Sequence, residues 1–178
     1  MSVKEELDHF FDKFLKEYSL TPNGLPTAPR RNDVDQSIYV GEADKGGWCK
    51  WKPIRQPKNK DFESLLDFYH IKKNNDIIEY FSTYFFSNID AIFKSHKILL
   101  SANMPDGFKR LKRILDGLQD GDTGTITYIP IGIEHPRGYT IAIDVNKGAI
   151  VHIDDETEKK RKIAPNLASF LHELEPDI

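Results

Sequence analysis

The last third of the chain carries the clearest pattern of hydrophobic and polar positions. Apolar residues alternate with polar or small residues over residues 125–133 and 138–144, and the turn sequence Asn146-Lys147-Gly148 leads into residues 149–153. A period of two is typical of half-buried strands, and Asn and Gly readily adopt the backbone angles of a tight hairpin turn. This segment is therefore predicted to form three strands.

One helix is predicted after these strands. A polar run over residues 154–162 precedes residues 163–174, in which Pro165 suits the first turn of a helix because no hydrogen bond is lost there. The apolar side chains at helical spacing are Ile163, Leu167, Phe170, Leu171 and Leu174. We expect this apolar face to lie across the strands.

The N-terminal part begins with a predicted amphipathic helix over residues 3–19, where apolar residues recur at helical spacing. Ser2 followed three residues later by Glu5 matches a capping box at its start. Residues 21–35 contain three prolines and are predicted to form an irregular loop. The apolar stripe of the helix is interpreted as a core face.

A short hairpin is predicted next, with strands over residues 37–40 and 48–51 joined by a glycine-rich acidic turn. Because side chains alternate along a strand, Cys49 and Trp51 would face one side and Trp48 the other. One tryptophan is then expected in the core and the other on the surface. A surface tryptophan beside an acidic turn is a candidate interface anchor; covering the sheet edge is the alternative role for Trp48.

The middle of the chain is predicted to alternate helices with one strand pair. The predicted elements are a basic connector over residues 53–60, helices over 62–69, 74–85 and 105–118, strands at 90–93 and 97–101, and a polar turn at 119–123. Together with the flanking elements, they predict one α+β domain spanning residues 1–178. We expect a mostly antiparallel sheet of about six strands, with helices packed against it.

Composition and charge narrow the function classes. Hydrophobic residues make up 39% of the chain and charged residues 30%, which is typical of a soluble globular protein. The net charge of −3 gives no reason to expect a nucleic-acid partner. Cys49 is the single cysteine, which fits a reducing compartment. The N-terminus is charged and no run has the length of a membrane span, so we expect a cytosolic protein that reaches a membrane only through a membrane-protein partner.

Recognisable catalytic and metal-binding motifs are mostly absent from the sequence. The six histidines show no helical metal-ligand spacing, and no serine or cysteine lies in a nucleophile motif. The best enzyme-like group comprises Asp144, His152, Asp154 and Asp155 at strand ends, where carboxylates and an imidazole can act as acid and base or hold a divalent ion. We interpret Asp144 as a turn residue and the acidic run as a solvated loop. The sequence therefore predicts no catalytic residues, no metal, no cofactor and no small-molecule substrate.

Acidic residues concentrate in a few predicted loops. The candidate partner-binding residues are Glu42 and Asp44 in the first hairpin turn with Trp48 beside them, Glu134 in the loop after a strand, and Asp154, Asp155 and Glu156 after the last strand. If the sheet brings these loops together, they form a negative surface that steers basic partners. Lys109, Arg110, Lys112 and Arg113 lie on the outer side of a predicted helix, where charges are usually solvated.

The order of these signals resembles the Syd family, the SecY-interacting proteins within the SUKH superfamily. The resemblance rests on Trp51-Lys52-Pro53, on Lys147-Gly148-Ala149-Ile150 at the last hairpin, and on the sequence Ile-Ala-Pro-Asn-Leu-Ala-Ser-Phe-Leu-His-Glu-Leu-Glu-Pro over residues 163–176. It implies a Syd/SUKH-like fold and an acidic surface that meets the basic cytosolic loops of SecY in the SecYEG translocon. Cytosolic loops of membrane proteins do carry excess Lys and Arg.

The resemblance implies a cytoplasmic binding protein, peripheral on the cytosolic side of the bacterial inner membrane, that regulates or checks SecYEG complexes. The superfamily offers an alternative. Many SUKH members are immunity proteins, which bind and neutralise a cognate toxin with the same scaffold. The partner is therefore expected to be either SecY loops or a basic toxin domain.

Overall fold

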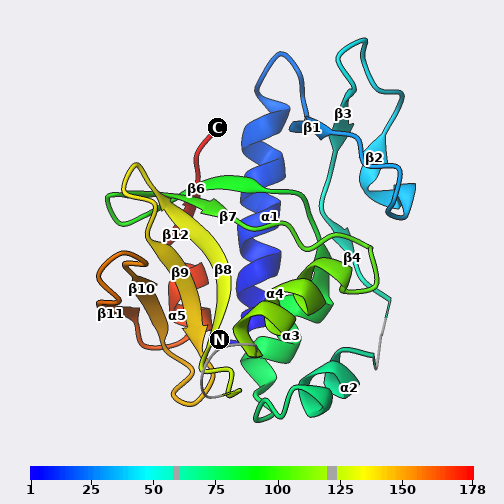
Figure 1. The fold of residues 1–178 in the computed structure, drawn as a ribbon. Coiled ribbons are helices and arrows are strands. Elements are labelled where there is room, and N and C mark those ends of the chain that lie inside the picture. Colours follow the sequence, from blue (N-terminus) through cyan, green and yellow to red (C-terminus); the bar gives the residue numbers. More distant parts are fainter. Residues whose placement is uncertain (58–60, 120–123) are drawn as a thin grey trace.

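A seven-stranded antiparallel sheet forms the centre of the fold in the computed structural model, which describes residues 1–57, 61–119 and 124–178 (Figure 1). Its strand order is β11-β10-β9-β8-β7-β6-β12. The strands are β6 (Ile89–Phe93), β7 (His96–Leu100), β8 (Tyr128–His135), β9 (Thr140–Asp144), β10 (Ile150–Ile153), β11 (Lys160–Ala164) and β12 (Leu174–Pro176). The predicted α+β class and mostly antiparallel sheet are confirmed, with seven strands in place of about six.

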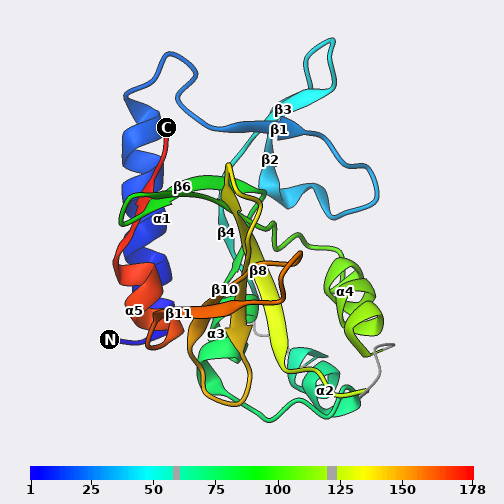
Figure 2. The same cartoon turned by 60° about the vertical axis from the view of Figure 1, so that its left-hand side comes forward.

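Five helices of the described part of the chain pack around this sheet. They are α1 (Val3–Ser19), α2 (Asp61–Phe68), α3 (Asn75–Thr83), α4 (Lys109–Gln119) and α5 (Leu167–His172). Helix α1 contacts α3, α5 and β12. In Figure 2, α1 and α5 lie to one side of β8 and β10, whereas α2 and α4 lie to the other side. Among the described residues, none of the helices combines the length and the apolar character needed to cross a membrane.

Helix α1 has the bounds that the sequence predicted, because its start signal is local. The Ser2 hydroxyl accepts a hydrogen bond from the Glu5 amide at 3.2 Å, and the Glu5 carboxylate accepts one from the Ser2 amide at 2.8 Å. This is the predicted capping box, which satisfies two amide groups that a helix start leaves without partners. The buried face of α1 consists of Val3, Glu6, Leu7, Phe10, Phe11 and Phe14.

The helix predicted over residues 163–174 is wrong in its bounds. Ile163 belongs to β11, the helix occupies only Leu167–His172, and Leu174 begins β12. A residue that precedes proline disfavours the helical conformation, so the chain stays extended up to Pro165. The Asn166 side chain then accepts a hydrogen bond from the Ser169 amide at 2.8 Å and caps α5.

The apolar stripe of this segment is nevertheless buried as expected. Leu167, Phe170, Leu171 and Leu174 are each at most 4% exposed. They belong to one continuous cluster of buried apolar residues that begins with Val3 of α1. The segment therefore closes the core, although strands contribute to it at both ends.

Short strands account for most of the other differences from prediction. They are β1 (Thr27–Pro29), β2 (Tyr39–Val40) and β3 (Trp48–Trp51), which form a sheet in the order β1-β3-β2, and β4 (Ile54–Arg55), which pairs with β5 (Tyr84–Phe85). The predicted loop over residues 21–35 thus contains β1, the connector contains β4, and the helix predicted to reach residue 85 ends at Thr83. A 3-10 turn, Gln36–Ile38, also replaces the start of the strand predicted from residue 37. Strands of two or three residues are too short to show a period of two.

Two further boundaries follow from backbone conformation and strand pairing. Gly107 and Phe108 have φ angles of +64° and +62°, which are incompatible with a right-handed helix, so α4 begins only at Lys109. The polar run predicted as a loop contains edge strand β11, which pairs with β10. Of the polar turn predicted at residues 119–123, Gln119 ends α4, and residues 120–123 lie outside the described residues.

Strand β3 confirms the predicted alternation. Cys49 and Trp51 are each 1% exposed, whereas Trp48 is 48% exposed on the opposite face. The ring of Trp51 lies 5.7 Å from that of Phe14 of α1. The small sheet is thereby joined to the main core on one side, and it presents Trp48 to solvent on the other.

Candidate partner interface

The β2–β3 turn and the first residue of β3 hold three of the predicted partner-binding residues. The Asp44 carboxylate accepts hydrogen bonds from the amides of Gly46 at 2.8 Å and Trp48 at 2.9 Å, which fixes the shape of the turn. Glu42 lies 3.4 Å from the Arg30 guanidinium, and its side chain is 96% exposed. An ion pair with one fully exposed partner is weak, so this carboxylate is accessible to a partner. Trp48 adds exposed aromatic surface beside it.

The β10–β11 turn holds the second predicted acidic group. One Asp154 carboxylate oxygen accepts from the amides of Glu156 at 3.1 Å and Thr157 at 3.2 Å, and the other accepts from the Thr157 hydroxyl at 2.6 Å. The Thr157 hydroxyl and these amides lower the pKa of Asp154. The Asp155 carboxylate accepts from the Thr140 hydroxyl at 2.8 Å. Asp154 therefore holds the turn, whereas the neighbouring Glu156 is exposed to solvent.

Glu134 is not in an exposed loop, so that prediction is wrong. Strand β8 continues to His135 and leaves Glu134 only 3% exposed. Its two carboxylate oxygens lie 2.7 Å from His96 Nδ1 and 3.3 Å from His152 Nε2. A buried carboxylate needs such polar neighbours to offset the loss of hydration. Glu134 therefore belongs to a Glu134–His96–His152 cluster, in which Glu134 and His152 are buried and His96 is partly exposed.

The environment of His152 is set by this cluster and by the next strand. The side chain is 5% exposed, and burial lowers the pKa of His152. The negative charge of Glu134 opposes that shift, and the neighbouring Arg161 and His96 add to it. Arg161 lies directly opposite His152 in the register of β10 and β11.

The two acidic turns do not meet. Figure 1 draws the β2–β3 turn at the upper right of the molecule and the β10–β11 turn at the lower left, with the main sheet between them. The sequence predicted a single acidic surface if the sheet brought these loops together. Glu42, Asp44 and Trp48 instead lie at the β2–β3 turn. Asp154, Asp155 and Glu156 lie at the distant β10–β11 turn.

The enzyme-like group of the sequence analysis is also divided. Asp144 is 5% exposed at the far end of β9 and accepts hydrogen bonds from the amides of Asn146 and Lys147, both at 3.0 Å. His152 and Asp154 lie at the opposite end of the β9–β10 hairpin. Within residues 1–57, 61–119 and 124–178, no three His, Cys, Asp or Glu side chains are grouped so that they could hold a metal ion. Asp144 acts as a turn residue, as the sequence analysis interpreted it.

Comparison with known proteins assigns the family. The sequence model of the Syd protein family (SUKH-2) matches residues 4–176, which is nearly the whole chain. The chain belongs to the Syd family. It is 26% identical to Protein Syd of Pseudoalteromonas atlantica, over 98% of this chain and 96% of that protein. It is 25% identical to Protein Syd of Photobacterium profundum, over 98% of this chain and 95% of that protein.

This Syd-family chain has a basic hollow that the sequence analysis did not predict. The basic hollow has a volume of about 460 Å³ and is lined by Arg137, Tyr139, His152, Asp154, Lys159, Lys160 and Arg161. Its residues come from the β8–β9 turn, from β10 and from the β10–β11 hairpin. The run of basic residues over 159–162 is visible in the sequence. That these side chains line the same hollow as Arg137 depends on strand pairing, which the sequence pattern does not show.

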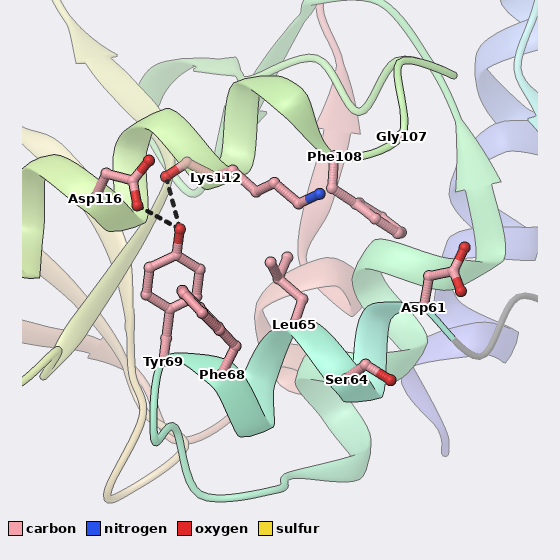
Figure 3. A pocket seen from close by; sticks show the side chains of 9 residues that line it. All are labelled: Asp61, Ser64, Leu65, Phe68, Tyr69, Gly107, Phe108, Lys112 and Asp116. Carbon is pink, nitrogen blue, oxygen red and sulfur yellow. Dashed lines mark hydrogen bonds between the residues drawn. The ribbon is translucent and has the colours of Figure 1, made fainter.

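A second hollow of about 620 Å³ separates α2 from α4 in this Syd-family fold (Figure 3). At one end of this hollow, the Tyr69 hydroxyl donates a hydrogen bond to the Asp116 carboxylate of α4 at 2.5 Å. This hydrogen bond, together with burial and the negative charge of Asp116, raises the pKa of Tyr69 to about 12. Phe68 is 70% exposed at the same place. The hydrogen bond between Tyr69 and Asp116 therefore links the end of α2 to α4.

Proposed function

We propose that this Syd-family protein is a non-enzymatic binding module that docks on the cytosolic loops of SecY. In this proposal it is cytoplasmic, sits peripherally at the cytosolic side of the bacterial inner membrane, and regulates or checks SecYEG complexes. The observation that carries the proposal is the match to the Syd family over residues 4–176. The two named relatives, which align with this chain over 98% of its length, support the same assignment.

The acidic turns supply the physical basis for docking. Cytosolic loops of membrane proteins are rich in Lys and Arg, and exposed carboxylates attract them over a Debye length of about 8 Å at physiological ionic strength. The β2–β3 turn offers Glu42 and the exposed Trp48, and the β10–β11 turn offers Asp155 and Glu156. Because the turns are apart, we propose that they are two separate contact points for extended basic loops.

The experiment measures the association rate of the purified protein with SecYEG in nanodiscs at several salt concentrations. One variant carries Glu42→Lys with Trp48→Ala, and a second carries Asp155→Lys with Glu156→Lys. Asp44 and Asp154 are left unchanged because they hold their turns. We expect wild-type association to slow as salt rises and each variant to associate more slowly, since rim charges act mainly on the association rate.

The control variant carries Lys109→Glu with Arg113→Glu on the exposed side of α4. We expect its association rate with SecYEG to stay close to that of the wild type. Loss of binding in this variant alone would place the contact on α4. An absence of wild-type binding to SecYEG would refute the proposed function.

A further inference from the structure

The basic hollow gathers positive charge from separate parts of the chain. Arg137 comes from the β8–β9 turn, Lys159 precedes β11, and Lys160 and Arg161 belong to β11. No ion pair within the described parts of the chain involves any of these four residues. Asp154 is the acidic residue that lines the hollow, and its carboxylate is occupied by hydrogen bonds within its own turn. The hollow therefore brings four positively charged side chains together with one carboxylate, Asp154, whose pKa is lowered by hydrogen bonds within its own turn and in part by the charge of Lys159.

Polar and aromatic groups complete the basic hollow. The Arg137 guanidinium lies 5.9 Å from the centre of the Tyr139 ring, an arrangement that holds a guanidinium in place while its N–H groups stay available. His152 lines the hollow from β10, and its Nε2 lies 3.3 Å from the Glu134 carboxylate without hydrogen-bond geometry. His152 and Arg161 also line an adjoining hollow of about 230 Å³, together with Lys94, His96 and Lys162. The two hollows thus share His152 and Arg161 in their lining.

Protection of an edge strand explains only part of this arrangement. Lysines on an exposed edge strand prevent pairing with other chains, which suffices for Lys160 and Lys162 on β11. It does not explain why Arg137, from another turn, lines the same hollow as Arg161. Convergence of two guanidinium groups and two lysines on one concave space is instead typical of binding to anionic oxygens.

We propose that the basic hollow binds a phosphate group carried by a small molecule. Guanidinium groups form paired hydrogen bonds to phosphate oxygens, and lysines add point charges. The volume of about 460 Å³ falls within the range of small-molecule sites. Asp155, Glu156 and Glu158 stand in the same hairpin and are exposed. They would be repelled by a flat anionic bilayer, which favours a compact ligand over a membrane surface.

This inference goes beyond docking on SecY and is tested without SecY. The probe is inorganic pyrophosphate, titrated into the full-length protein while backbone amide shifts are followed by NMR and affinity by calorimetry. We expect the largest shifts at residues 137–139, 152 and 159–161. The variant Arg137→Gln with Arg161→Gln should weaken binding by about tenfold or more, because it removes two charge-assisted contacts.

The matched control is Lys109→Gln with Arg113→Gln, which removes the same charge from α4. Its affinity for pyrophosphate should stay within about twofold of the wild type, because distant exposed charges are screened. Equal weakening in both variants would show a general charge effect and overturn the site. Absence of shifts around the basic hollow in the wild type would overturn it as well. Thermal melts of both variants check that each is folded.

A second arm distinguishes the source of the phosphate. The protein is sedimented with vesicles of phosphatidylglycerol and phosphatidylcholine, with and without pyrophosphate. Pyrophosphate binding without retention on vesicles, the expected result, assigns the phosphate to a small ligand. Retention on vesicles that is lost in Arg137→Gln with Arg161→Gln, and displaced by pyrophosphate, would assign it to a lipid headgroup and overturn the preference for a small molecule.

Discussion

Truncation of Leu171 tests whether α5 closes the hydrophobic core. Leu171 is 2% exposed, on a helix that packs against α1, α3 and β11. Leu171→Ala removes three carbon atoms from a buried position. At about 0.8 kcal/mol for each buried carbon group, the lost transfer free energy is about 2.4 kcal/mol. The cavity that remains adds to this, so we expect the free energy of unfolding to fall by about 2–5 kcal/mol.

The assay is urea unfolding followed by far-UV circular dichroism and by tryptophan fluorescence, since Trp51 is buried in the same core cluster. Leu20→Ala is the control, because Leu20 follows α1 directly and is 83% exposed. Its free energy of unfolding should change by no more than about 0.5 kcal/mol. A change below about 1 kcal/mol for Leu171→Ala, or one that matches the control, would contradict the packing of α5 described above.

Three further predictions concern stability. Ser2→Ala removes the capping box of α1 and should lower the free energy of unfolding by about 1 kcal/mol in urea titrations; no change would mean that the cap is not formed in solution. Gly132→Ala would place a Cβ 2.7 Å from the Leu99 carbonyl oxygen, and we expect a loss of about 1–3 kcal/mol in the same assay. Because burial lowers the pKa of His152 below its ordinary value of 6.5, the unfolded chain takes up that proton more readily. Stability should therefore fall as pH drops through 6.5, and His152→Gln should weaken this dependence; a wild-type protein that gains stability on acidification would refute the sign.

One continuous acidic surface and two separate acidic turns lead to different expectations for partner binding. A single acidic groove would lose most of its attraction when either turn is reversed in charge. Two separate contact points would each lose part of it, and the two variants together would lose more than either one alone. The association rates of the single and combined variants therefore test the geometry of docking independently of the identity of the partner.

The sequence alone determined the elements whose signals are local. The bounds of α1 follow from its capping box and helical spacing, and the alternation in β3 correctly separated Trp51 from Trp48. The hairpin of β9 and β10 follows from a period of two around a turn of Asn, Lys and Gly. In each case the deciding interactions lie within a few residues along the chain, where propensity and periodicity act.

Tertiary structure decided everything that depends on pairing between distant segments. β11 and β12 form because they pair with β10 and β6, although Ile163 and Leu174 fit a helical spacing. The burial of Glu134 depends on β8 extending to His135 and on histidines from two other strands. The two acidic turns belong to different sheets, and the order of strands in the main sheet brings Arg137 and Arg161 to the same hollow. Charge clusters on a surface are set by strand order and register, which local periodicity along the chain does not encode.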